Sequence, residues 1–369
     1  MSADEPAPLA LTLAQRIAQR IAEDGPLSVA EYMAAALTDP AHGYYMGRDP
    51  LGAGGDFITA PEISQMFGEL IGLWCADTWQ RLGAPAQVAL VELGPGRGTL
   101  MADALRAARQ EPAFAAALQV HLVEASPALK ARQGEALRDA DATWHETLAG
   151  VPELPLLLIA NECFDALPVR QLVRQADGWG ERSVALAEES EALSFAVSPP
   201  DPALEALVPE SLRDAPVEQV FEVSPASQEI ARAIGRRLQS QGGAALIIDY
   251  GHETSALGET LQAVRRHAPH DVLCDPGTAD LTCHVDFAAL DLAAREAGAA
   301  AHGPVAQGAF LERLGIAARA ARLMEQATPP QREDIRAARL RLTAPDQMGE
   351  LFRVLALTQD GFGPPSGFA

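Results

Sequence analysis

The sequence predicts an α/β protein in which a mostly parallel sheet is covered by helices. Apolar runs of strand length recur along the chain and alternate with helix-like stretches, as expected for repeated β–α units. The runs are continuously apolar, which is typical of strands buried on both faces. In order, they are VALVEL (88–93), VHLVE (120–124), ATWHETL (142–148), PLLLIAN (155–161) and ALIIDY (245–250).

The first 85 residues, which precede this pattern, are expected to be mostly helical. Leu13, Ile17 and Ile21 share one face of an amphipathic helix, and a second apolar stripe at helical spacing runs from Ile63 to Trp74. Between them lies a glycine-rich polar stretch, which we expect to close over a bound ligand. Its characteristic residues are Gly54, Gly55, Asp56 and Thr59.

Two regions interrupt the β–α alternation. Residues 169–200 predict short antiparallel strands with a turn at Asp177-Gly178, so we expect a β insertion at the sheet edge over about residues 169–216. Helical patterns over 286–298 and 310–326 flank a strand over 299–307, and the second helix belongs to a helical insertion over about 308–345. The segment 350–359 predicts the last strand. We therefore expect an N-terminal region, 1–85, and a core, 86–369.

The composition excludes several classes of protein. With 28 basic and 50 acidic residues the net charge is −22, which argues against a nucleic-acid binder and suits a basic or cationic partner. The four cysteines form no CxxC pair, which fits a reducing compartment, so we expect a cytoplasmic location. We recognise no signal or transit sequence. The longest apolar runs are of strand length, so no membrane insertion is expected.

A glycine loop follows the first apolar run. A dinucleotide loop has the spacing G-x-G-x-x-G, but Thr99 stands where its third glycine would be. The observed spacing, Glu92 followed by Gly94, Gly96 and Gly98, is instead the pattern of S-adenosylmethionine (SAM) methyltransferases. Glycine lets the backbone pass close to a ligand, and free N–H groups at the start of the next helix can bind the methionine carboxylate.

Pro95 and Glu124 support the same ligand. Pro95 removes one N–H donor from a loop that would need several donors for a pyrophosphate. Glu124 ends the next strand, where a carboxylate can accept both ribose hydroxyls of an adenosyl group. The alternative interpretation is structural: a tight strand-to-helix turn with a solvated acid beyond it.

Polar residues also follow the later apolar runs, at the edge where open α/β sheets bind ligands. Glu162 and Asp165 are candidates to hold a cationic acceptor by charge-assisted pairing. The alternative is that Asn161 and Asp165 cap a helix. Asp249 or His252 could relay a proton, although each residue type is more often a structural hydrogen-bonding group.

Other kinds of site are not expected. His270, Cys274, Cys283 and His284 lie close in sequence, but their spacing matches no zinc module, and adjacent residues point apart on a strand. We therefore expect no metal. Asp286 is expected to be the N-cap of the next helix. The chain has neither a G-x-S-x-G turn nor a P-loop.

Taken together, several segments resemble the MidA-like SAM-dependent methyltransferases, a family that includes a mitochondrial complex I assembly factor that methylates a protein arginine. The resemblance covers most of residues 26 to 290 and departs from the family pattern at Cys163, where an aromatic residue is expected. The matching segments are GDFITAPEISQMFGELIG, VELGPGRGTLMADALR, ANECFDALPVRQ, IIDYGH, TLQAVRRH and ADLTCHVDF.

The resemblance implies a class I, Rossmann-like methyltransferase core, SAM as cofactor, and a protein acceptor such as a subunit of respiratory complex I. A homodimer is compatible with it. We expect in-line methyl transfer to an arginine; the alternatives are a non-catalytic SAM-binding assembly factor and an NAD(P)-dependent oxidoreductase. The expected cofactor residues are Glu92, Gly94, Gly96, Gly98, Glu124 and Asn161, and the expected catalytic residues are Glu162, Asp165 and His252.

Overall fold

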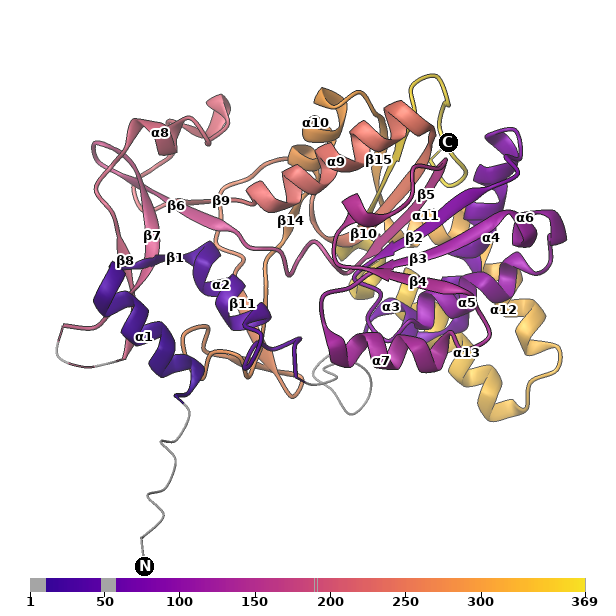
Figure 1. Ribbon diagram of the computed structural model, residues 1–369, viewed down its shortest axis with the longest axis horizontal. Coiled ribbons are helices and arrows are strands. Elements are labelled where there is room, and N and C mark those ends of the chain that lie inside the picture. The colour runs from indigo at the N-terminus through magenta and orange to yellow at the C-terminus, as the bar shows by residue number, and fades with distance from the viewer. Residues whose placement is uncertain (1–10, 48–57, 189, 191, 369) are drawn as a thin grey trace, which may run out of the picture.

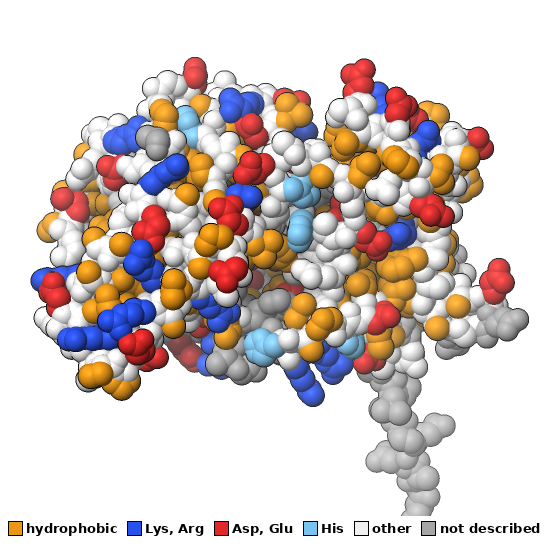
Figure 2. Space-filling model, turned by 180° about the vertical axis from the view of Figure 1, so that it is seen from behind, with side chains coloured by type: hydrophobic (Ala, Val, Ile, Leu, Met, Phe, Trp, Pro, Cys, Tyr) orange, Lys and Arg blue, Asp and Glu red, His pale blue; other side chains and the backbone are white. Residues whose placement is uncertain are grey.

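The computed structural model describes residues 11–47, 58–188, 190 and 192–368. It shows two lobes side by side (Figure 1). The larger lobe is built on a central sheet, and the smaller lobe combines the N-terminal helices with strands from the middle of the chain. On the face drawn in Figure 2 the surface is indented between the lobes, and histidine side chains are visible there.

The parallel sheet expected from the apolar runs is confirmed. In the described residues its order is β15-β16-β10-β5-β2-β3-β4, with β14 beside β10. β2 is parallel to both neighbours, whereas β16 is antiparallel to β10 and β15. The strand order reverses at β2, which opens a crevice at the carboxyl ends there. The strands are β2 (Val88–Leu93), β3 (Leu118–Val123), β4 (Ala142–His145), β5 (Leu156–Asn161), β10 (Gly243–His252), β14 (Val285–Asp286), β15 (Ala300–Ala306) and β16 (Phe352–Thr358).

Strand β2 shows why the apolar runs are continuous. Val88 and Leu90 belong to the hydrophobic core on one face of the sheet, and Ala89 and Val91 belong to the core on the other. Side chains of α4, α5 and α12 complete the first core, and those of α9 and α10 complete the second. The helices of this lobe are α3 (Ala60–Ile63), α4 (Gln65–Arg81), α5 (Thr99–Ala108), α6 (Pro112–Ala117), α7 (Pro127–Ala136), α9 (Pro225–Gln241), α10 (Phe287–Glu296), α11 (Gln307–Arg313), α12 (Ile316–Met324) and α13 (Pro329–Thr343).

The inserted strands do not extend the central sheet, contrary to the expectation of an insertion at its edge. They pair with each other and with β1 in the order β1-β7-β6-β9, with β8 on β7. Their own core explains this, because Trp179 is fully buried among Leu172 and Phe221. The elements are β1 (Leu27–Ser28), β6 (Arg170–Gln175), β7 (Gly178–Leu186), β8 (Leu193–Val197), α8 (Pro202–Glu205) and β9 (Val220–Val223).

The N-terminal helices α1 (Leu13–Asp24) and α2 (Val29–Thr38) pack on this smaller lobe. The expected apolar face of α1 is buried and belongs to the same core as Val184 and Leu281. Leu281 lies in a three-stranded sheet of β11 (Gln262–Arg265), β12 (Ala268–His270) and β13 (Asp280–Thr282). The N-terminal region therefore links the inserted strands with the segment that follows β10.

The helix expected over 310–326 is two helices, α11 and α12. Gly315 has a φ of 91° and separates them, because a left-handed residue cannot continue a right-handed helix. Arg319 of α12 then reaches Glu69 of α4, with 2.7 Å between its Nε and a carboxylate oxygen. Among the described residues, no helix has the length and hydrophobicity needed to span a membrane.

Candidate active site

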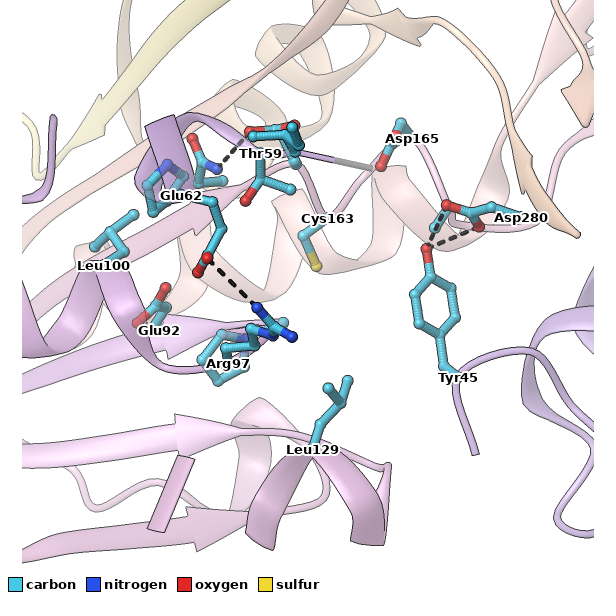
Figure 3. Close-up of a pocket in the computed structure, with 18 of the residues that line it drawn as sticks. Tyr45, Thr59, Glu62, Glu92, Arg97, Leu100, Leu129, Cys163, Asp165 and Asp280 are labelled. Carbon is cyan, nitrogen blue, oxygen red and sulfur yellow. Dashed lines mark hydrogen bonds and ion pairs between the residues drawn. The ribbon is translucent and has the colours of Figure 1, made fainter. Parts of the chain in front are cut away.

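A cavity of about 630 Å³ opens at the carboxyl ends of β2, β3 and β5, where the strand order reverses (Figure 3). Side chains from both lobes line it. Its polar and charged lining residues are Thr38, Tyr45, Thr59, Glu62, Arg97, Thr99, Glu92, Glu124, Ser126, Asn161, Glu162, Asp165, Tyr250, Gln262, Asp280, His284 and Arg341. In the described lining, six carboxylates therefore face two guanidinium groups.

The three glycines of the loop all have positive φ, between 54° and 83°. Such angles favour glycine strongly, so the spacing found in the sequence reflects a real backbone requirement. Gly94 also approaches Cys163 closely: a Cβ atom at Gly94 would lie 2.8 Å from Sγ of Cys163. The loop and the turn after β5 therefore pack against each other without space for a side chain at Gly94.

Glu124 is held in place beneath the loop by two donors. One carboxylate oxygen accepts the N–H of Ser126 at 2.8 Å, and the other accepts the Gln133 amide at 2.9 Å. The same amide group donates to the carbonyl of Gly96, and the Gln133 oxygen accepts from Trp144. Burial raises the pKa of Glu124. Sequence reasoning missed Gln133, which joins the glycine loop to the carboxylate expected to bind the ribose.

Glu92 and Asn161 each present a buried oxygen without a hydrogen-bond partner among the described residues, Oε2 and Oδ1 respectively. Both line the cavity. Burial raises the pKa of Glu92 to about 8, although the N–H of Met101 opposes the shift. Buried acceptors without donors are costly unless a ligand supplies the donors. The expected cofactor SAM fits, because its methionyl ammonium group carries N–H donors and its ribose carries hydroxyls.

Glu162 lies at the turn after β5 with a left-handed φ of 49°. Its Oε1 accepts the N–H of Ala60, the first residue of α3, at 2.7 Å and the amide of Asn161 at 3.1 Å. Burial raises the pKa of Glu162 to about 7. Asn161 and Asp165 do not cap a following helix, as one alternative proposed, because no helix starts directly after β5. Instead Glu162 accepts from the start of α3.

Asp249 has a structural role. One of its carboxylate oxygens accepts the N–H groups of Cys163, Phe164 and Asp165 at 2.9–3.2 Å, and the other accepts the N–H of Tyr250. These bonds fix the turn after β5, and Asp249 does not line the cavity. Asp165 does line it. Burial raises the pKa of Asp165, and the neighbouring Tyr250 hydroxyl opposes the shift.

The structure does not bring His252 to the cavity. β10 and β14 pair with His252 opposite Asp286, and the imidazole Nε2 lies 4.0 Å from a carboxylate oxygen of Asp286. Asp286 also accepts the N–H of Ala289, so it is the N-cap of α10, as expected. His284 lines the cavity instead, with its ring 5.4 Å from that of Tyr250 in an edge-to-face arrangement.

The N-terminal region contributes side chains to the cavity that sequence reasoning did not assign. Glu62 of α3 accepts the Thr99 hydroxyl at 2.5 Å and lies 3.6 Å from Arg97, so α3 is attached to the glycine loop. Tyr45 donates to both oxygens of Asp280 at 2.8 and 2.9 Å. Thr59 lines the cavity, whereas the other expected covering residues, Gly54, Gly55 and Asp56, lie outside the described residues.

The histidines and cysteines weighed as a metal site do not meet at one point. His270 and Cys274 lie near Asp275, with possible ligand atoms within 4.8 Å, but Cys283 is buried elsewhere and His284 faces the cavity. Asp275 is exposed and lies 3.4 Å from Arg265.

Comparison with known proteins gives consistent matches. A family described as "Putative S-adenosyl-L-methionine-dependent methyltransferase" matches residues 70–305. The chain is 40% identical to the protein arginine methyltransferase NDUFAF7, mitochondrial, of Mus musculus, covering 92% of this chain and 82% of that protein. It is 37% identical to the Homo sapiens protein of the same name, covering 96% and 86% respectively.

A solved structure also matches. It is a Burkholderia thailandensis protein, described as a "likely methyl transferase", bound to S-adenosyl-homocysteine. The TM-score is 0.84 at 30% sequence identity, and the match covers 99% of this chain and 97% of that one.

The relatives contradict the expected location. The sequence predicted a cytoplasmic protein, but the Drosophila, mouse and human relatives are called mitochondrial. The prediction rested on unpaired cysteines, and reduced thiols do not distinguish one reducing compartment from another. The cytoplasmic prediction is therefore withdrawn.

The family match spans more than half of the chain, and the relatives are more than 30% identical over nearly all of it. The chain therefore belongs to the family of MidA-like S-adenosyl-L-methionine-dependent methyltransferases, and SAM is its cofactor.

Proposed function

We propose that this methyltransferase transfers the methyl group of SAM to an arginine side chain of a protein. The observation that carries the proposal is the charge of the cavity beyond the glycine loop, where Glu162, Asp165 and Asp280 face a single described guanidinium, that of Arg341. Such a surface favours a cationic acceptor. The net charge of −22 suits a basic protein partner, and the curated relatives are called protein arginine methyltransferases.

The cofactor half of the proposal assigns Glu92 and Asn161 to the methionyl ammonium group, since both have an unpartnered buried oxygen. Glu124 accepts the ribose hydroxyls, because each of its oxygens has one protein donor and can accept a second hydrogen bond. Gly94, Gly96 and Gly98, which complete the expected set, let the backbone approach the ligand and direct N–H groups at its carboxylate.

SAM supplies an electrophilic methyl group on a sulfonium. The protein's task is to align the acceptor nitrogen with that methyl and to exclude water. The nitrogen bonds to the methyl carbon as the carbon–sulfur bond breaks, and the acceptor then loses one proton. A buried carboxylate of the cavity, such as Asp165, receives it; burial raises the pKa of Asp165, which suits proton acceptance near neutral pH. His252 lies outside the cavity lining and takes no part.

Two finer assignments come from the family resemblance. We propose that the acceptor is a subunit of respiratory complex I and that methylation serves complex assembly. Mass spectrometry of complex I subunits from cells with and without this protein tests this, and an unchanged pattern of arginine methylation would remove it. We also propose that the protein can form a homodimer, and light scattering of the purified chain tests that.

The activity is tested with SAM carrying a tritiated methyl group and protein extract from cells that lack this protein. We expect label in methylarginine after acid hydrolysis. Label confined to lysine would refute the arginine proposal. Tight binding of S-adenosyl-homocysteine together with no transfer at all would instead support the non-catalytic assembly factor.

A further inference from the structure

The cavity lining includes Asp165, Asp280, Tyr45 and Tyr250, which we call the acceptor arm. Figure 3 shows Asp165, Asp280 and Tyr45 on the side of the cavity away from Glu62 and Glu92. Asp165 belongs to the turn after β5 of the larger lobe. Asp280 begins β13 in the three-stranded sheet, and Tyr45 follows the N-terminal helix α2. Tyr250 belongs to β10, so four separate parts of the chain meet at this arm, although no sequence motif joins them.

Each aspartate of the arm has a tyrosine beside it. Tyr45 donates to both oxygens of Asp280, and the Tyr250 hydroxyl is close enough to Asp165 to oppose the rise in its pKa that burial causes. The two aspartates are only 8% and 5% exposed. They are also fixed relative to each other, because the N–H of Cys283, three residues after Asp280, donates to the carbonyl of Asp165 at 2.9 Å. The charges of both act on the Tyr45 phenol: after burial, Asp280 and then Asp165 raise its pKa.

Glu162, the third carboxylate of this region, is already engaged. Its Oε1 accepts the N–H of Ala60 and the amide of Asn161. Glu162 therefore ties the turn after β5 to the first residue of α3. Figure 3 places Asp165 and Asp280 together at the opposite end from Glu62 and Glu92.

We propose that Asp165 and Asp280 jointly bind the guanidinium of the acceptor arginine, that Tyr45 and Tyr250 position the two carboxylates, and that Glu162 positions α3 instead of binding the acceptor. This inference rests on the proposed arginine methylation. A guanidinium has five N–H donors in one plane, so two carboxylates can hold two edges and leave one nitrogen for the methyl. As the nitrogen–carbon bond forms and the carbon–sulfur bond breaks, the nitrogen's proton passes to one of the two aspartates.

Tyr45 also connects this arm to the cofactor end. Its carbonyl accepts the Ser126 hydroxyl at 2.5 Å, and the N–H of Ser126 donates to Glu124. One residue therefore contacts both the neighbour of the ribose-binding carboxylate and the acceptor arm. The Tyr45 hydroxyl contributes to acceptor binding, whereas its backbone carbonyl contributes to the cofactor end. A substitution that removes only the hydroxyl therefore tests the first contribution without changing the second.

The test uses the full chain, tritiated SAM and the same protein extract, and it measures methylarginine formation against extract concentration. Asp280→Asn keeps an acceptor for the Tyr45 hydroxyl but removes the charge, so we expect labelling at low extract concentration to fall about 30-fold or more. Affinity for S-adenosyl-homocysteine should stay within about threefold. Glu162→Gln should lower the labelling less than Asp280→Asn does, because its amide oxygen still accepts from Ala60.

Tyr45→Phe tests the positioning role and does not depend on whether Asp280→Asn folds. It should raise the apparent KM for extract protein while leaving kcat and S-adenosyl-homocysteine affinity nearly unchanged. Tyr32→Phe is the matched control, because it removes a buried hydroxyl bond to the Val272 carbonyl in the same lobe, and it should change none of these values.

The outcomes separate the two proposals. The inference is overturned if wild type and Asp280→Asn form equal amounts of labelled methylarginine. It is also overturned if Glu162→Gln loses the label and Asp280→Asn keeps it. In both cases the proposed arginine methylation remains valid. Equal KM values for Tyr45→Phe and Tyr32→Phe overturn the positioning role. If the wild-type protein forms no labelled methylarginine, the proposed function itself is refuted, whatever the variants do.

Discussion

Replacing Glu92 with glutamine should stabilise the free protein at neutral pH and weaken its cofactor binding. Glu92 is 3% exposed, its Oε2 has no partner among the described residues, and burial raises its pKa from 4.5 to about 8. When the pKa of an acid is higher in the folded protein than in the unfolded chain, its contribution to the free energy of unfolding is fully present only below the pKa of the unfolded chain. That contribution is lost as the pH rises from 4.5 toward 8, because the unfolded chain ionises first.

The size of this loss of stability follows from the two pKa values of Glu92. With about 1.4 kcal/mol per pKa unit, raising the pH from 5 to 7.5 removes about 3 kcal/mol of stability through Glu92 alone. Glutamine does not titrate, so Glu92→Gln should lack this loss. The free energy of unfolding in urea, measured for both proteins at pH 5 and 7.5, gives the difference directly. The same change removes an acceptor that can ionise when the methionyl ammonium binds beside it, so affinity for S-adenosyl-homocysteine at pH 7.5 should fall about tenfold.

Glu146→Gln provides the control for the removal of one carboxylate, because Glu146 is exposed just after β4 and lies outside the cavity lining, so the affinity of this variant for S-adenosyl-homocysteine should equal that of wild type. If wild type and Glu92→Gln lose the same stability between pH 5 and 7.5, Glu92 is ionised in the free protein. The argument that its buried oxygen awaits a ligand donor would then fail.

Two further changes test the loop and its support. Gly94→Ala places a methyl group 2.8 Å from Cys163 Sγ at a φ of 59°, so cofactor affinity measured by calorimetry should fall more than about tenfold. Gly83→Ala is the control, because Gly83 has a φ of 87° with open space around it, and it should leave the affinity unchanged. Gln133→Leu removes the amide that joins the Gly96 carbonyl to Glu124, so affinity should fall about tenfold; unchanged affinity would show that Glu124 needs no such support.

The sheet could be predicted from the sequence because it depends on a local signal. The central strands β2 and β5 are almost continuous apolar runs. Val88 and Leu90 face one core and Ala89 and Val91 face the other, which explains why no polar residue interrupts this part of β2. The break at Gly315 was missed because a single glycine inside a helical pattern is usually tolerated. The separate sheet of the inserted strands was missed because strand partners depend on tertiary packing, which a strand pattern does not encode.

The site could be predicted from sequence only at the glycine loop, where one short motif contains both the glycines and Glu92. Tyr45 and Asp280 hydrogen-bond across 235 positions of sequence, so neither predicts the other. From sequence, His252 was expected at the site, whereas His284 was considered only as a metal ligand. The β10–β14 register determines their positions: His252 lies opposite Asp286, and His284, the residue before β14, lines the cavity. A pairing register between distant segments is not visible in either segment alone.

The buried acids of this protein differ in what surrounds their oxygens, and that difference separates their tasks. Asp249 accepts four backbone N–H groups, which leaves it little capacity for a ligand and makes it a structural support for the turn after β5. Glu124 is held by one donor on each oxygen, so it is oriented and still able to accept. Glu92 retains an oxygen with no described partner. Because an unpaired buried carboxylate oxygen costs stability in the free protein, the ligand that supplies its donors gains affinity from relieving that cost.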